Sequence, residues 1–293
     1  MPLDEDKYPV ESDRRRFVKG VVGGASLAGI ATAGAAAINS TTSSSGGGGG
    51  SVTFRAIENT DGPAPRGMPQ IPIELEEIPG EDDFYIKGRW PEVSEVEEQG
   101  KTLKVAREDI AGETYSSEWF QYCGVQTYPG VYPDATEENS DLTNYFRYNA
   151  NSKFTWQNEE VSGGQKMKPS HFSDYETWGN GIGTAGIGKP ASGSWRSEDL
   201  EPSETMAVEV IRSSRIEEAA QDNEWLSKTT DKGVMAHLNK CTHFCCVPAF
   251  KGQAGAANFG ASDRVYCQCH QSVYDPFNII STNYVALPRP ARD

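Results

Sequence analysis

The chain has 293 residues, of which 42 are acidic and 27 basic, so its formal net charge at pH 7 is −15. A balance this acidic argues against nucleic acid as a partner, because nucleic-acid binding requires a basic surface. The charge is uneven: residues 1–20 are neutral on balance, residues 232–293 carry +3, and residues 21–231 carry −18. An acidic surface of this kind stays hydrated in concentrated salt, where screening suppresses its self-repulsion.

The N-terminal segment predicts export and membrane attachment. Residues 13–19 read Asp-Arg-Arg-Arg-Phe-Val-Lys, which fits the twin-arginine export pattern. An uncharged run of 18 residues follows, from Val21 to Ile38, and this length just spans a bilayer as a helix. Basic residues precede the run, so we expect residues 1–20 in the cytoplasm and the rest of the chain on the outer face of the cell membrane.

Two fates of residues 21–38 remain open, retention as a single-pass anchor and cleavage as a signal. We favour retention, because the segment has the length of a span and no strong Ala-x-Ala site follows it. Together with the acidic balance, the twin-arginine pattern resembles halophilic archaeal proteins.

Residues 39–51 predict a flexible tether. From Ser40 to Ser51 the chain contains only Ser, Thr and Gly, including five consecutive glycines. This composition behaves as a flexible coil. It is either a simple spacer or a tether that lets the following domain move.

Residues 52–203 predict an acidic, loop-rich β region. Three short runs have strand character: 71–75, 84–87 and 102–105. A polar stretch at 136–143 and a glycine-rich stretch at 179–193 are typical of loops. Aromatic residues at 119–123 and 145–148 are expected to pack onto a β core. The region is either a surface elaboration or a docking face for a partner subunit.

Two short stretches within residues 204–293 bring thiol and imidazole groups together. Residues 241–246 read Cys-Thr-His-Phe-Cys-Cys, and residues 267–272 read Cys-Gln-Cys-His-Gln-Ser. Each stretch offers one thiolate and one imidazole at close spacing. Two Cys and two His split between two loops are what a Rieske [2Fe–2S] centre requires, with the thiolates on one iron and the imidazoles on the other.

This pair of motifs resembles the Rieske iron–sulfur proteins of cytochrome bc-type quinol-oxidising complexes. The family pattern is Cys-Thr-His-x-Gly-Cys, followed by Cys-Pro-Cys-His-Gly-Ser-x-Tyr-Asp. The resemblance covers about the last third of the chain, where Met206–Arg212 looks like a family strand, followed by a short acidic helix and a strand led by Trp225. It implies an all-β fold: an antiparallel Rieske-type β-sandwich with a small cluster-binding subdomain at about residues 237–280.

The resemblance also implies which residues bind the cofactor. Cys241 and Cys267 would be thiolate ligands, and His243 and His270 imidazole ligands, of one [2Fe–2S] cluster per chain. Either imidazole would face the solvent and contact quinol, and the sequence does not choose between them. The remaining histidines, His171 and His237, are expected to be surface or strand residues.

Four further positions match the family. Ser272 and Tyr274 would donate hydrogen bonds to a cluster sulfide and a ligand thiolate, which raises the reduction potential. Cys246 and Cys269 would form a disulfide that joins the two loops. Such a bond closes a loop of about two dozen residues and is worth roughly 3–4 kcal/mol in the chain-entropy model.

Several positions depart from the family pattern. Cys245 and Gln271 replace glycines, which usually allow a positive φ, and Gln268 replaces a proline. The Gly-Pro-Ala-Pro loop that covers the cluster in the family has its expected counterpart in residues 287–290. The family pattern assigns no partner to Cys123, and two alternatives are open. Cys123 forms a disulfide with Cys245, or Cys245 competes with Cys246 for Cys269.

The resemblance implies a membrane-anchored redox subunit, which is not a complete enzyme by itself. It would take electrons from quinol beside a cytochrome b-type membrane subunit and pass them to a soluble blue copper protein or cytochrome. One alternative is an electron relay to an exported molybdenum oxidoreductase of the nitrate reductase or arsenite oxidase type. Another is a zinc-stabilised binding module, although zinc does not call for two extra cysteines.

Overall fold

The computed structural model describes residues 49–98, 101–135 and 142–290. All of them belong to one unit, which comprises residues 43–293. The predicted twin-arginine segment, the predicted span at 21–38 and most of the predicted tether lie outside the described residues. Within the described ranges, no helix has both the length and the apolar character needed to cross a bilayer.

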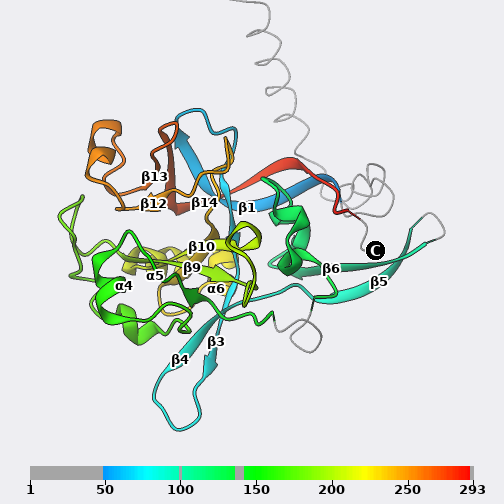
Figure 1. Ribbon diagram of the computed structural model, residues 1–293, viewed down its shortest axis with the longest axis horizontal. Coiled ribbons are helices and arrows are strands. Elements are labelled where there is room, and N and C mark those ends of the chain that lie inside the picture. The colour runs from blue at the N-terminus through cyan, green and yellow to red at the C-terminus, as the bar shows by residue number, and fades with distance from the viewer. Residues whose placement is uncertain (1–48, 99–100, 136–141, 291–293) are drawn as a thin grey trace, which may run out of the picture. The chain divides into compact units, whose positions relative to one another are not determined.

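Antiparallel pairing dominates the fold, as predicted, and one sheet of nine strands holds most of the strands (Figure 1). Their order across the sheet is β12-β13-β14-β1-β2-β11-β10-β9-β8. The strands are β1 (Gly50–Asp61), β2 (Met68–Ile71), β8 (Arg147–Tyr148), β9 (Lys189–Trp195), β10 (Met206–Arg212), β11 (Val234–Leu238), β12 (Ala249–Phe250), β13 (Val265–Cys267) and β14 (Ser272–Ala286). The all-β prediction is therefore confirmed at this level.

Two smaller sheets project from the main sheet (Figure 1). One pairs β3 (Ile73–Glu77) with β4 (Phe84–Gly88), and the other contains β5 (Val93–Glu98), β6 (Lys101–Ile110) and β7 (Glu113–Ser116). They include the predicted strand-like runs at 84–87 and 102–105 and most of the run at 71–75. The run at 71–75 is divided between β2 and β3 at Pro72, because proline has no N–H to donate to a ladder.

Helices are few and short. The α-helices are α4 (Thr155–Glu160), α5 (Ser214–Asp222) and α6 (Glu224–Thr229); the 3-10 turns are η2 (Ser117–Phe120), η3 (Val125–Thr127), η4 (Pro129–Val131), η5 (Pro169–Phe172), η6 (Pro202–Glu204) and η7 (Ala254–Phe259). α5 is the predicted acidic helix. The predicted strand at Trp225 is wrong, because Asn223 caps a helix there by accepting a hydrogen bond from the Leu226 N–H.

The main sheet crosses the expected domain boundary at 203/204. β9 pairs along its whole length with β10, and β2 pairs with β11. The expected loop at 179–193 accordingly gives way to strand from Lys189 onward. Gly193 is needed in that strand, because a β-carbon there would lie 2.4 Å from the Arg147 carbonyl oxygen on β8. β1 also begins at Gly50, so it includes the end of the expected tether.

Of three apolar clusters among the described residues, the two larger ones support the sheet. The larger core contains the aromatic side chains predicted to pack there, including Trp119, Phe120 and Phe146, all with zero exposure. The smaller core contains Cys241 and Cys267, together with aliphatic and aromatic side chains of the main sheet. The two cysteine-bearing loops therefore begin inside a packed apolar layer.

Candidate metal centre

Two neighbouring loops carry the predicted ligands. The first connects β11 to β12 and the second connects β13 to β14, while β12 pairs with β13. Each loop is closed by a backbone hydrogen bond to the carbonyl oxygen of its first cysteine. Cys245 N donates to Cys241 O at 2.9 Å, and Gln271 N donates to Cys267 O at 2.8 Å.

The two donors of these bonds have left-handed backbone conformations. The φ angle is 63° at Cys245 and 65° at Gln271, the two positions where the resemblance expects glycine. A β-carbon in this conformation costs roughly 1–2 kcal/mol. The replacement of glycine has therefore left the turn geometry in place at an energetic cost.

The thiols and imidazoles of the predicted ligands converge in pairs. Cys241 and Cys267 are the free cysteines of the described chain, and both are fully buried. The rings of His243 and His270 lie with their centroids 4.7 Å apart and their planes at 86°. His243 is partly buried and His270 is exposed, so the thiols lie on the inner side of the pair of loops and the imidazoles on the outer side.

The donor atoms suit a metal. The two thiols are hydrogen-bonded to each other, which lowers the pKa of Cys241 and raises the pKa of Cys267. His243 Nδ1 is buried and has no hydrogen-bond partner among the described residues. A buried polar atom left without a partner is costly, and metal coordination would remove that cost.

Three cysteine sulfurs lie close together beside the predicted ligands, but they do not form a three-thiolate metal site. The sulfurs of Cys246, Cys267 and Cys269 lie within 4.8 Å of one another. Cys246 and Cys269 form the predicted disulfide, with Cα atoms 6.6 Å apart. Their sulfurs are consumed in that bond, so Cys267 alone supplies a thiolate from this group. The disulfide packs against the predicted ligand and ties the two loops together.

Hydrogen bonds converge on the Cys241 sulfur. The Tyr274 hydroxyl donates to Cys241 Sγ at 3.1 Å and accepts from the Thr242 N–H at 3.3 Å. Burial raises the pKa of Tyr274, which keeps the hydroxyl protonated as a donor. The Ser272 hydroxyl also lowers the pKa of Cys241 by hydrogen bonding, after the larger effects of Cys267 and Tyr274.

A loop that the sequence analysis missed lies against this site. Residues 62–65, between β1 and β2, read Gly-Pro-Ala-Pro. Ala64 N donates to Ser272 Oγ at 3.2 Å, and the Thr242 hydroxyl donates to the Arg66 carbonyl oxygen at 2.6 Å. Gly62 has a φ of 82°, and a β-carbon there would lie 2.6 Å from the Ser272 Cα.

Residues 287–290, the expected counterpart, lie elsewhere. The Leu287 N–H donates to the Gln121 carbonyl oxygen, outside the two cysteine loops. The expectation was wrong because it assumed that the loop must follow the second cysteine motif in the chain. The literal Gly-Pro-Ala-Pro sequence was the signal that would have found it.

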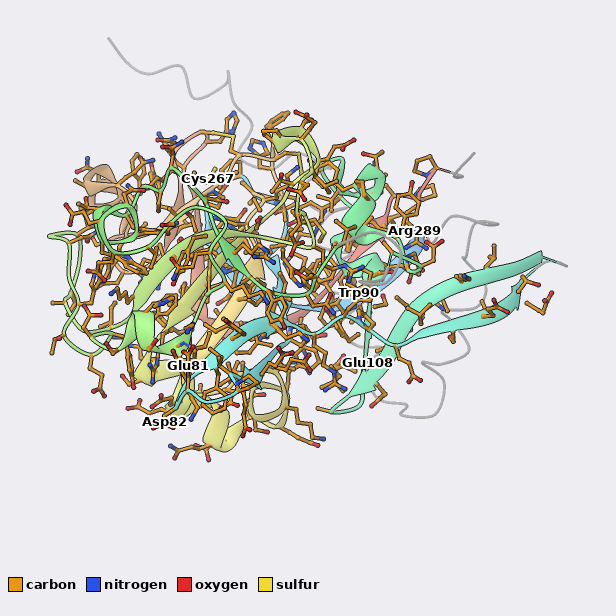
Figure 2. The ribbon with its side chains drawn as sticks, turned by 60° about the horizontal axis from the view of Figure 1, so that its bottom comes forward. Glu81, Asp82, Trp90, Glu108, Cys267 and Arg289 are labelled. Carbon is orange, nitrogen blue, oxygen red and sulfur yellow. A yellow bond between two sulfur atoms is a disulfide. The ribbon has the colours of Figure 1, made fainter. Side chains whose placement is uncertain are left out.

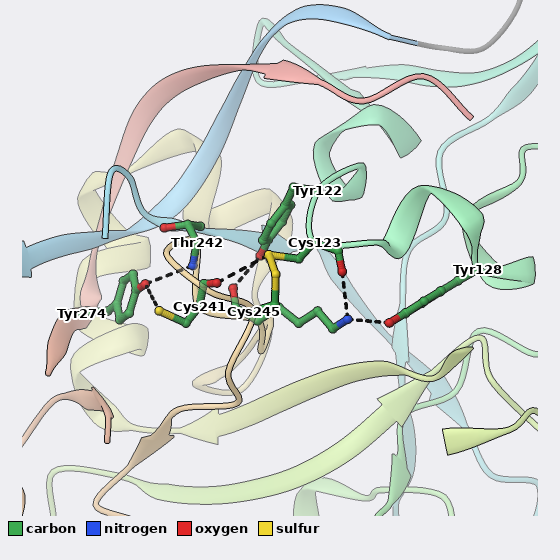
Figure 3. The surroundings of a disulfide bond; sticks show 8 residues. Tyr122, Cys123, Tyr128, Cys241, Thr242, Cys245 and Tyr274 are labelled. Atoms are coloured by element: carbon green, nitrogen blue, oxygen red, sulfur yellow. Dashed lines mark hydrogen bonds between the residues drawn. A yellow bond between two sulfur atoms is a disulfide. The ribbon is translucent and has the colours of Figure 1, made fainter. Parts of the chain in front are cut away.

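A second disulfide fastens the first loop to the preceding region (Figure 3). It joins Cys245 to Cys123, which lies between η2 and η3, with Cα atoms 5.4 Å apart. The Tyr122 hydroxyl donates to the Lys240 carbonyl oxygen at 2.9 Å, and Lys240 Nζ donates to the Cys123 carbonyl oxygen at 3.2 Å. The alternative in which Cys245 competes for Cys269 is therefore not the arrangement adopted.

The other two histidines lie outside this set. His237 is a fully buried residue of β11, and His171 lies in η5 with Nδ1 at 3.0 Å from the Tyr148 hydroxyl. No family model, curated protein or solved structure matches the chain.

Proposed function

We propose that the chain is a membrane-anchored Rieske-type [2Fe–2S] subunit that transfers electrons from quinol to an exported acceptor. The observation that supports this most is the pairing of Cys241 with Cys267 inside, and of His243 with His270 outside, on two loops tied by a disulfide. Zinc alone would not explain Tyr274 and Ser272 directed at a thiolate sulfur.

The residues would divide the work between holding the cofactor and meeting the substrate. When bound, the cluster supplies one-electron transfer at a potential raised by its imidazole ligands. Cys241, Cys267, His243 and His270 would hold it. The exposed imidazole of His270 would accept a hydrogen bond from the quinol hydroxyl, since it is the more accessible of the two. Cys241 and Cys267 are fully buried in an apolar core, which would exclude water from the thiolates.

The proposed surroundings follow from the sequence. The proposal includes an anchor at residues 21–38 and a cytochrome b-type membrane subunit as partner. It also includes a blue copper protein or cytochrome as electron acceptor. Identification of the subunits that purify with the chain separates quinol oxidation from relay to a molybdenum enzyme. A multi-haem cytochrome b is the expected companion, and a molybdenum subunit in its place would refute quinol oxidation.

Metal analysis combined with electron paramagnetic resonance of the reduced protein tests the cofactor. We expect two irons per chain, by the definition of the cluster, and a signal that Cys267→Ser abolishes. Cys123→Ser is the matched control, because it removes a cysteine outside the donor set and should keep the iron. Bound zinc without an iron signal would refute the proposal.

A further inference from the structure

A pair of titratable side chains lies buried where the first loop begins and ends. Glu209 of β10 and His237 of β11 are direct cross-strand neighbours, and neither has any exposed surface. Glu209 Oε2 lies 3.6 Å from His237 Nε2. None of the roles assigned above uses this pair.

The pair is incompletely hydrogen-bonded. Glu209 Oε1 accepts a hydrogen bond from the Phe250 N–H at 2.9 Å. Glu209 Oε2 and both ring nitrogens of His237 have no partner among the described residues. Buried polar atoms are normally satisfied, and exceptions commonly mark a functional group. A carboxylate oxygen without a fixed donor is free to gain or lose a proton.

The position of the pair connects it to the candidate metal centre. His237 precedes Cys241 by four residues, and Phe250 follows Cys246 by four residues. Four residues of extended chain span at most about 14 Å. The Phe250 ring also packs in the same apolar core as Cys241 and Cys267. The Glu209 carboxyl therefore contacts both strands that flank the first loop, and through Phe250 it adjoins the apolar core that contains the thiols.

Burial sets the charge of the pair. It raises the pKa of Glu209 to about 8 and lowers the pKa of His237 to about 3. The Phe250 N–H and the positive charge of Lys153 partly offset the effect on Glu209. At neutral pH the carboxyl is therefore protonated and the imidazole neutral. Lys153 itself donates to the Val247 carbonyl oxygen at 3.1 Å.

The other polar groups around the pair are engaged elsewhere. Ser192 lies opposite Glu209 on β9, and its N–H bonds to Gln157. Gln70 lies opposite His237 on β2, and its side chain bonds to Trp225 and Thr229. Lys251, next to Phe250, has its Nζ 3.5 Å from an Asp263 oxygen.

We propose that the Glu209–His237 pair is a proton site linked to the oxidation state of the metal centre. Where Glu209 is ionised while the centre is oxidised, one proton from solvent joins its carboxylate when an electron donor adds one electron to the centre, and the proton leaves when the electron passes on. The reason is electrostatic, since added negative charge in a low-dielectric interior favours protonation of a nearby carboxylate. This inference rests on the proposed function.

The pH dependence of the reduction potential tests the linkage. Below about pH 8 the carboxyl is protonated in both oxidation states, so the linkage acts only above that value. Above about pH 8 we expect the reduction potential of the unmodified protein to fall more steeply with pH than that of Glu209→Gln. The difference between the two slopes should correspond to the uptake of up to one extra proton per electron. Titrating groups other than Glu209 are the same in both proteins, so their effect on the potential cancels in the difference.

Glu108→Gln is the matched control. Burial also raises the pKa of Glu108, but this residue lies on β6, away from Cys267 (Figure 2). The reduction potential of Glu108→Gln should equal that of the unmodified protein at every pH. Infrared difference spectra of the unmodified protein give a second measurement without a variant. Reduction above about pH 8 should convert a carboxylate band into a protonated carboxyl band.

Two results overturn the inference alone: parallel potential curves for the unmodified protein and Glu209→Gln, or reduction without a carboxyl band. A chain that binds no iron overturns the proposed function and this inference together. Iron content, measured first, distinguishes these failures.

Discussion

At the scale of single residues, the chain places ordinary side chains where the backbone conformation favours glycine. Cys245 and Gln271 both have positive φ, and both donate the hydrogen bond that closes a cysteine loop. At Cys245 the strained backbone conformation accompanies a disulfide, because its sulfur bonds to Cys123. The Tyr274 hydroxyl donates to Cys241 Sγ, one of the two thiols that the resemblance makes ligands.

Removal of the Tyr274 hydroxyl should lower the reduction potential and leave the iron bound. A hydrogen bond to a charged acceptor is worth about 1.5–3 kcal/mol, and only part of that differs between oxidation states. We expect Tyr274→Phe to lower the potential by roughly 50 mV in a redox titration. Tyr122→Phe is the control, because its hydroxyl bonds to a backbone oxygen. An unchanged potential in Tyr274→Phe would show that the bond has no redox role.

At the scale of elements, the order of segments along the chain differs from their order around the site. β1 pairs antiparallel with β14 over most of its length, so the β1–β2 loop lies against the second cysteine loop. The resemblance places a Gly-Pro-Ala-Pro loop after the second motif, whereas here a segment far upstream provides it. Strand pairing, which has no local sequence signal, is what delivers residues 62–65 to the site.

The disulfide between Cys123 and Cys245 should stabilise the fold, because it joins two distant segments of the chain. We expect Cys123→Ser/Cys245→Ala to unfold at lower denaturant concentration than the unmodified protein, with a loss of up to about 4–5 kcal/mol in the chain-entropy model. Cys123→Ser/Cys245→Gly should be more stable than the alanine variant by about 1 kcal/mol, because glycine adopts the positive φ without strain. Guanidinium unfolding measures both differences. Equal stability of the two double variants would mean that the loop relaxes.

At the scale of the whole molecule, charge and sheet architecture act over the full length of the described chain. Strands from both sides of residue 203 share one sheet, so the two predicted regions are folded against each other. The net charge of −15 adds repulsion between surface carboxylates in the folded state. Salt concentration is therefore expected to set the stability of the domain.

Thermal unfolding at different salt concentrations tests this expectation. Raising the ionic strength from about 0.1 M to about 1 M shortens the Debye length from about 10 Å to about 3 Å. The melting temperature should rise over this interval. A chloride salt is suitable, because it screens charge without the strong exclusion effects of sulfate. A melting temperature that stays constant or falls would rule out surface repulsion as a dominant factor.

The sequence by itself determined the types and spacing of the candidate ligands, because each cysteine–histidine pair lies within one short turn. It also indicated β4, β6 and most of β3 as strand-like runs, and the resemblance indicated β10. Trp225 shows where the resemblance fails: it implies a strand there, and the local capping residue Asn223 begins a helix instead.

Only the tertiary structure decided which distant residues meet. It paired Cys123 with Cys245, placed residues 62–65 over the cysteine loops, and buried Glu209 beside His237. Each of these contacts joins segments far apart in the chain, and their partners are set by strand order and packing. No periodicity within a single segment carries that information.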